Sequence, residues 1–132
     1  MVVLAGQKAK KAVRGAKKLW LMATQAIGKR VRLKPGSLPK VYEWARTIAA
    51  RRDEALATLK DEGVTIESAF LEHAADGDYL VYYVRTHDLQ RSSDAAAKSS
   101  DPIDRYHQSF KEETWDERTT LELFVDLSNE GR

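Results

Sequence analysis

The chain of 132 residues contains no cysteine, and this absence excludes several classes of function. Without thiols there is no disulfide framework, no cysteine nucleophile and no zinc site built on cysteine. A chain without disulfides is suited to a reducing compartment, so we expect a cytoplasmic protein.

Long apolar runs and glycine-rich loops are also absent. No apolar stretch reaches the length of about 18 residues that a membrane-spanning helix needs, and the patch at residues 19–22 is too short for a signal-peptide core. The seven glycines are scattered, so no phosphate-binding loop is indicated. No serine stands in a Gly-x-Ser-x-Gly setting, which argues against a serine hydrolase.

Acidic residues are missing from the first third of the chain. Residues 1–42 hold eleven Lys or Arg and no acid, whereas the remaining 90 residues hold eleven basic residues and all twenty acids. A nucleic-acid-binding domain usually carries its positive charge on the folded body, but here the charge gathers ahead of it. We therefore divide the chain into a basic leader (1–24), a folded domain (25–127) and a tail (128–132).

Three interpretations of the basic leader stay open. It could be an arm that contacts nucleic acid or acidic lipid. It could be an organellar leader, although such leaders are usually rich in serine. The third interpretation places the native start at Met22, so that the preceding residues are not part of the native protein. In each case we expect the folded domain to form without residues 1–21.

The pattern of the folded domain predicts alternating strands and helices. The first strand, at 26–34, should place Ile27, Val31 and Leu33 on one face and Arg30 and Arg32 on the other. The expected elements are strands at 26–34, 64–73, 78–85 and 119–126, a long helix from 39 to 62, a short helical piece at 94–98, and a helix from 102 to about 115. This βαββαβ order predicts an α+β, ferredoxin-like sandwich: a four-stranded antiparallel sheet with helices on one face.

The hairpin around Asp76-Gly77 indicates how the sheet is used. If His73 faces Asp78, both faces of the second and third strands hold large apolar residues. One face carries Ala69, Leu71, Leu80, Tyr82 and Val84; the other carries Ile66, Phe70, Val81 and Tyr83, with Ser68, Glu72 and Arg85 among them. A sheet with one face in water should alternate more cleanly. We therefore expect a homodimer formed through the face that the helices leave open.

Three segments carry a resemblance to a known group of proteins. GKRVRLKPG at 28–36, EWAR at 43–46, and DPIDRYH at 101–107 followed by Phe110 resemble a bacterial family of uncharacterised small proteins, a domain-of-unknown-function family. By its pattern that family is similar to the dimeric α+β-barrel (ferredoxin-like) superfamily, and the resemblance spans residues 25–126. It implies a barrel made from two open sheets. The superfamily includes cofactor-free monooxygenases, isomerases, haem-degrading enzymes and stress-response proteins, so the fold alone assigns no activity.

His107 and Tyr83 are the candidate catalytic residues. His107 lies on the inner stripe of the second helix with Ile103, Tyr106 and Phe110, where a histidine can serve as a general base. The alternative is a buried histidine that is hydrogen-bonded in the core.

Trp44, Arg32, Glu72 and Arg85 are the candidate ligand-binding residues. The three charged residues could form a polar pocket for an organic acid, or ion pairs across a dimer interface, because buried charges are normally paired. Trp44 could contact a flat ligand, although aromatic residues at helical spacing more often belong to the core.

No metal or cofactor is expected, since His73, His87 and His107 lack a metal-ligand spacing. The sequence thus predicts a small homodimeric α+β-barrel protein that binds a small organic ligand between sheet and helices. A cofactor-independent monooxygenase or isomerase is one alternative. A nucleic-acid-associated protein that acts through its leader is the other, and it is disfavoured.

Overall fold

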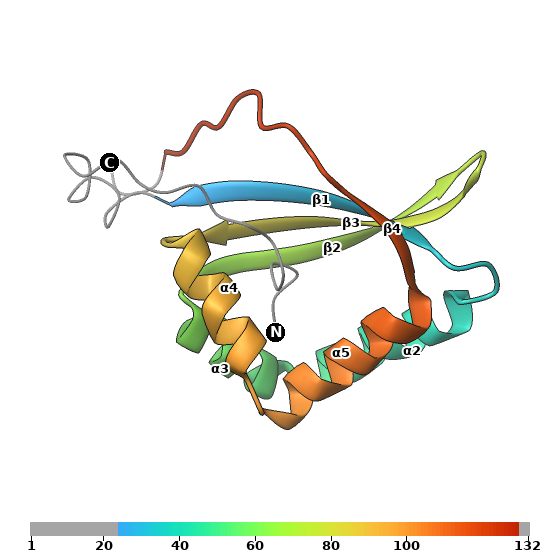
Figure 1. Ribbon diagram of the computed structural model, residues 1–132, viewed down its shortest axis with the longest axis horizontal. Coiled ribbons are helices and arrows are strands. Elements are labelled where there is room, and N and C mark those ends of the chain that lie inside the picture. The colour runs from blue at the N-terminus through green and yellow to red at the C-terminus, as the bar shows by residue number, and fades with distance from the viewer. Residues whose placement is uncertain (1–23, 130–132) are drawn as a thin grey trace.

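The computed structural model describes residues 24–129 of the chain, so our expectations for the leader fall outside it, apart from Thr24. The described part is an α+β fold with four strands and four helices (Figure 1). In chain order these are β1 (Gln25–Leu33), α2 (Leu38–Ala50), α3 (Arg52–Glu62), β2 (Val64–Ala74), β3 (Gly77–Thr86), α4 (Leu89–Lys98), α5 (Pro102–Thr114) and β4 (Trp115–Thr120). Among these residues, no helix is both long and apolar enough to cross a membrane.

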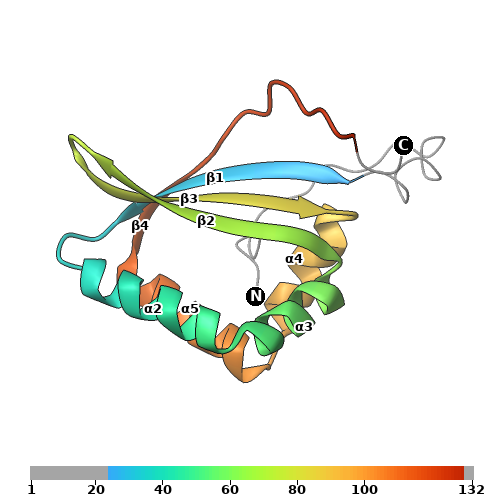
Figure 2. The same ribbon diagram turned by 180° about the vertical axis from the view of Figure 1, so that it is seen from behind.

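The four strands form one sheet in the order β2-β3-β1-β4, and each neighbouring pair is antiparallel. All four helices lie on the same side of this sheet, as the two opposite views show (Figures 1 and 2). On the other side the chain beyond β4 arches above β1 (Figure 1). We refer to this second side as the open face.

The alternation predicted for β1 is confirmed. Val31 and Leu33 are buried on the helix side, whereas Arg30 and Arg32 are half-buried on the open face. The hairpin register is confirmed as well, because His73 pairs with Asp78 across β2 and β3. Gly77 follows the turn with φ = 142°, a conformation that glycine adopts without strain.

The core lies between the sheet and the helices and is built around aromatic rings. Trp44 of α2 stacks on Phe110 of α5, with ring centroids 4.5 Å apart, and meets Tyr82 of β3 edge-on at 6.4 Å. Val31 and Val84 are fully buried beneath these rings. This packing attaches α2 and α5 to the sheet.

The long helix expected at 39–62 is interrupted. Arg51, with φ −108° and ψ 36°, separates α2 from α3, and no glycine or proline marks the break. The change of direction alters which residues face inward. In α3 the apolar Leu56 is 46% exposed, whereas Thr58 and Glu62 are buried.

The last strand and the helical piece before α5 also differ from expectation. β4 begins at Trp115, which pairs with Leu33, and ends at Thr120 rather than near residue 126. The Leu121 amide still donates to the Gly28 carbonyl at 2.9 Å, after which the chain leaves the sheet. The piece expected at 94–98 extends over Leu89–Lys98, because the Asp88 carboxylate caps its first turn by accepting from the Arg91 amide.

Gly63 ends α3 in the left-handed conformation, with φ = 72°, as expected of a helix C-cap. A methyl group there would meet nothing closer than the Arg91 guanidinium at 3.9 Å, so only the backbone is strained by a side chain. We expect Gly63→Ala to lower the free energy of unfolding by ~1 kcal/mol, measured by urea denaturation. Gly63→Asn is the matched control and should lose less, because Asn tolerates this conformation; equal stability of all three proteins would contradict the prediction.

Candidate functional site

The sheet divides the residues predicted for the site into two groups. Trp44 and His107 lie on the helix side and are buried. The alternation of the strands places the other four on the open face: Arg32, Glu72, Tyr83 and Arg85. Within one chain, therefore, the two candidate catalytic residues, His107 and Tyr83, do not meet at one site.

On the helix side, His107 belongs to a cluster of buried rings that we call the ring cluster. It consists of Trp44, Tyr82, His107, Phe110 and Trp115. The His107 centroid lies 5.7 Å from that of Trp44 and 6.2 Å from that of Trp115. The cluster joins α2, α5, β3 and the first residue of β4.

The protonation of His107 follows from its surroundings. The Trp44 indole N–H donates to Nδ1 of His107 at 3.2 Å, which assigns the remaining ring proton to Nε2. Burial, aided by the nearby positive charge of Lys111, lowers the pKa of His107 to about 3. His107 is therefore a neutral imidazole at physiological pH, with Nε2–H as a donor.

Three buried groups of the ring cluster have no hydrogen-bond partner among residues 24–129: His107 Nε2, the Tyr82 hydroxyl and Trp115 Nε1. Burial raises the pKa of the Tyr82 hydroxyl well above 10, so it too remains protonated. The Trp115 indole lies beside this hydroxyl and partly offsets the effect, without a well-aligned hydrogen bond. Buried polar groups nearly always have a hydrogen-bond partner, so three unbonded donors in one cluster are unusual.

Positive charge lies next to these donors. The Lys111 side chain is buried, with Nζ 4.8 Å from the Trp115 ring centroid, and the Arg118 guanidinium lies 4.7 Å from the same ring. Burial, with the charges of Arg118 and Lys29, lowers the pKa of Lys111 to about 8, although the Glu67 carboxylate opposes the effect. Three cations against one carboxylate leave this end of the ring cluster with an excess of positive charge.

The helices cover the helix-facing side of β2 incompletely. Ala69 is exposed on that side, and its neighbours Glu67 and Leu71 are only half-buried. Ala69 pairs with Tyr82 in the sheet, so this thinly covered strip borders the ring cluster directly.

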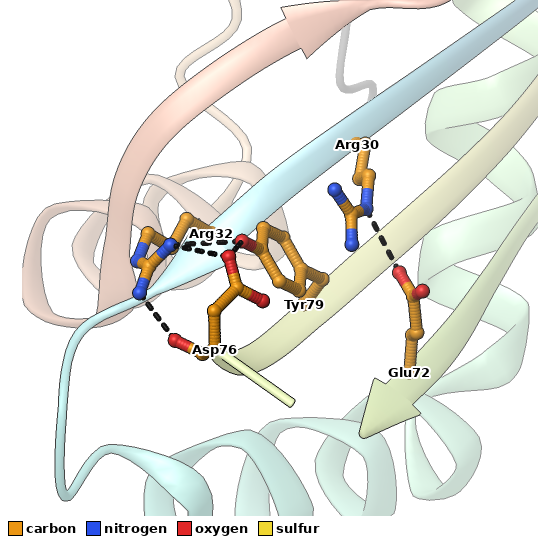
Figure 3. A network of polar contacts seen from close by, with 5 residues as sticks. All are labelled: Arg30, Arg32, Glu72, Asp76 and Tyr79. Carbon is orange, nitrogen blue, oxygen red and sulfur yellow. Dashed lines mark hydrogen bonds and ion pairs between the residues drawn. The ribbon is translucent and has the colours of Figure 1, made fainter. Parts of the chain in front are cut away.

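On the open face, the charged residues are paired within the chain (Figure 3). The Arg30 Nε atom donates to the Glu72 carboxylate at 2.9 Å, and its guanidinium lies 3.6 Å from the Tyr79 ring centroid. Arg32 donates to the Tyr79 hydroxyl at 2.8 Å and to the Asp76 carboxylate at 3.2 Å. The Tyr79 hydroxyl in turn donates to Asp76 at 2.7 Å, which together with Arg32 lowers the pKa of that carboxyl group.

Arg85 is the most enclosed charge of the open face. It donates to the Tyr83 hydroxyl at 2.7 Å, to Thr24 at 2.7 Å and to the Asp126 carboxylate at 2.5 Å. The Asp126 hydrogen bond, followed by that of Tyr83, raises the pKa of Arg85, so the guanidinium is always charged. The charges expected to pair across a dimer or to bind an organic acid thus have partners in their own chain.

Two hollows lie on the open face. The larger, of about 560 Å³, lies beneath residues 121–127 and is bordered by Gly28, Tyr83 and Arg85. The smaller, of about 260 Å³, is lined by Arg30, Arg32, Asp76, Tyr79, Glu117 and Thr119. The larger one brings together two of the predicted site residues, Tyr83 and Arg85.

Tyr82 and Lys111, which lie in or beside the ring cluster, were not predicted as site residues. Lys111 lies four residues after His107 on α5, which is the helical spacing that brings two side chains to one face. Tyr82 shares its strand face with Val84, as the alternation predicted, but was assigned to the core. The other histidines are exposed, and among residues 24–129 no group of three potential metal ligands occurs.

A comparison with protein families gives a match that spans most of the chain. The model of a family of unknown function (DUF6176) matches residues 24–131, a range that contains all of the strands and helices described above. No curated protein matches the chain.

The depressed pKa of His107 predicts a pH dependence of stability. In the unfolded chain His107 binds a proton below about pH 6.5, but in the folded protein it does so only below about 3. Between these values the unfolded state binds more protons, so stability is lost as pH falls from 6.5 towards 3, by up to ~1.4 kcal/mol per pH unit. The free energy of unfolding of the wild type, minus that of His107→Phe, should therefore rise between pH 4 and 7 in urea titrations.

Subtracting the variant removes the contribution of carboxylates common to both proteins. Phe110→Leu, a change in the same cluster without a titrating group, should give a difference that is independent of pH. A flat difference for His107→Phe would show that His107 is not held neutral by burial.

Proposed function

Since the chain belongs to this family of unknown function, we propose that it is a homodimeric protein that binds a small organic acid between the sheet and the helices. The observation that carries the proposal is the set of three unbonded donors in the ring cluster, beside the buried Lys111. Each unbonded donor costs about 1–3 kcal/mol relative to a bonded one, so an acceptor that satisfies them gains substantial binding energy.

The chemistry of the ring cluster favours a carboxylate over a neutral ligand. A carboxylate has only acceptor atoms, which match the donors on His107, Tyr82 and Trp115. Its charge balances that of Lys111, and hydrogen bonds to an ionised acceptor are about twice as strong as neutral ones. The aromatic rings around it suit an apolar or flat ligand body, as in most small-molecule sites.

Binding is favoured over catalysis by the state of His107. A general base works best with a pKa near the operating pH, whereas the pKa of His107 is lowered to about 3. Tyr83, its predicted catalytic partner, lies on the opposite face of β3. A cofactor-independent monooxygenase or isomerase would need another proton acceptor, so we assign His107 the role of a hydrogen-bond donor to the ligand.

Assembly as a ferredoxin-like α+β barrel is the second part of the proposal. The strand order β2-β3-β1-β4 and the helices on one side support this architecture. On the open face, Phe70 is 61% exposed and Ile66 is 36% exposed, although both belong to the sheet. Large apolar side chains grouped on an uncovered face mark an interaction surface, and a second copy of the same face would cover them.

Lys111→Met tests the ligand proposal. Removing a buried charge whose pKa is lowered from 10.5 to about 8 should raise the free energy of unfolding at pH 7 by up to ~3 kcal/mol, at about 1.4 kcal/mol per pH unit. The same change should abolish the rise in melting temperature that benzoate or phenylacetate gives the wild type in a thermal-shift assay. Lys98→Met, on an exposed helix end, is the control and should change neither. A variant that is stabilised by the acids as much as the wild type would contradict the proposal.

Phe70→Asp tests the dimer. The full chain should have the mass of a dimer in light scattering at tens of micromolar, with at least ~1,000 Å² buried between the copies. An aspartate in place of the exposed Phe70 puts an unpaired charge into that interface, so the mass should fall to that of a monomer. Tyr42→Asp, at an aromatic residue that is 47% exposed on α2, should remain dimeric. A monomeric wild type would exclude the dimer.

A further inference from the structure

Beyond β4 the chain arches above β1 (Figure 1), and several of its large apolar side chains are exposed to water. After the hydrogen bond of Leu121 to Gly28, residues 122–129 adopt no regular structure. Leu123 is 57% exposed, Phe124 86% and Leu127 89%. With Val125, which is 70% exposed, Phe124 and Leu127 are the most exposed large apolar residues of the described chain, and water is a poor environment for them.

The sequence of residues 121–127 is that of a strand. Along this segment one face would carry Leu121, Leu123 and Val125, and the other face would carry Glu122 and Phe124. This alternation is the pattern of a β-strand. This pattern is why the last strand was predicted to reach residue 126. The segment therefore has the composition of a sheet element but no sheet partner within residues 24–129.

A long strand edge lies on the far side of the sheet from β4. Among the residues that the structure describes, the eleven-residue strand β2 pairs only with β3, so the outward-facing half of its backbone groups has no strand neighbour there. Ile66 and Phe70, both exposed, lie along it on the open face. Natural proteins rarely leave an edge of this length uncovered.

The segment is poorly placed to cover the β2 edge of its own chain. β1 and β3 lie between β4 and β2, which at about 4.8 Å per strand amounts to a separation of about 14 Å across the sheet. In a face-to-face dimer, a two-fold axis parallel to the strands places the β4 edge of one copy opposite the β2 edge of the other. Packed sheets lie about 10 Å apart, and seven extended residues span about 23 Å, so the segment reaches that edge with residues to spare.

We infer that residues 121–127 of each copy cross to a second copy of this chain and pair with the free edge of β2 as a fifth strand. The inference rests on the proposed homodimer and specifies how its two copies are joined. Edge pairing satisfies the backbone groups of both strands, and the two-fold symmetry makes the exchange reciprocal. Asp126 leaves the Arg85 of its own chain, which keeps its hydrogen bonds to Tyr83 and Thr24.

The absence of native cysteine allows a direct test by disulfide formation. The Phe124→Cys protein would be mixed in turn with Ile66→Cys, Ser68→Cys and Phe70→Cys, each as the full chain. In each mixture the dimers would be dissociated, allowed to reassociate, and then oxidised. Two cysteines join only if their Cα atoms lie within about 7 Å. We expect a disulfide-linked dimer of two different chains for at least one β2 position, and none when Phe124→Cys is mixed with Tyr42→Cys.

A second measurement separates this inference from the dimer itself. Removal of residues 121–132, with folding checked by circular dichroism, should raise the dimer dissociation constant at least tenfold in analytical ultracentrifugation. A full chain that is dimeric, yet gives no mixed disulfide at any β2 position and keeps its dissociation constant after the deletion, overturns the exchange and leaves the dimer intact. A full chain that is monomeric overturns both.

Discussion

The Trp44 side chain is the contact on which the helical layer depends. Its ring stacks on Phe110 at 4.5 Å and meets Tyr82 at 6.4 Å, and its N–H donates to His107 at 3.2 Å. One side chain of α2 thus holds α5 and the sheet together. Aromatic pairs of this kind contribute about 0.5–1.5 kcal/mol each beyond their buried area, and the hydrogen bond orients the imidazole as well. The position of every group in the ring cluster follows from this arrangement.

The two faces of the sheet differ in how their charges are compensated, and this difference decides where a ligand is expected. On the open face, both side chains of the Arg30–Glu72 ion pair are more than one third exposed, so the pair contributes at most about 1 kcal/mol to stability. Each of its two charges has an opposite partner. On the helix side, Lys111 is buried beside Lys29 and Arg118, and the Glu67 carboxylate offsets their repulsion only in part, because the pKa of Lys111 remains lowered to about 8. Incomplete compensation of a buried charge destabilises the folded chain. Proteins keep destabilising arrangements of this kind where function requires them, so we expect the ligand on the helix side of the sheet.

Local patterns predicted most of the fold. The facing of Arg30 and Arg32 follows from the two-residue period of a strand, and the pairing of His73 with Asp78 follows from the turn next to it. The break at Arg51 and the end of β4 at Thr120 depend on packing between distant segments, so no local sequence pattern predicts them. The positions of the candidate site residues depend on the same two kinds of information. The helical stripe located His107, but the tyrosine that shares its cluster is Tyr82 rather than Tyr83, because neighbouring residues of a strand lie on opposite faces.

β3 connects the two proposed activities of the protein. Tyr82 belongs to the ring cluster, and the next residue, Tyr83, holds Arg85 on the open face, so one strand contacts both the ligand site and the dimer surface. β3 is also a central strand, paired on both edges by β1 and β2, and it cannot shift without disturbing both neighbours. Ligand binding can bias the assembly only if it favours one of two arrangements of such a shared element. The ladders on both sides of β3 oppose a second arrangement, which favours a binding site that is independent of dimer formation.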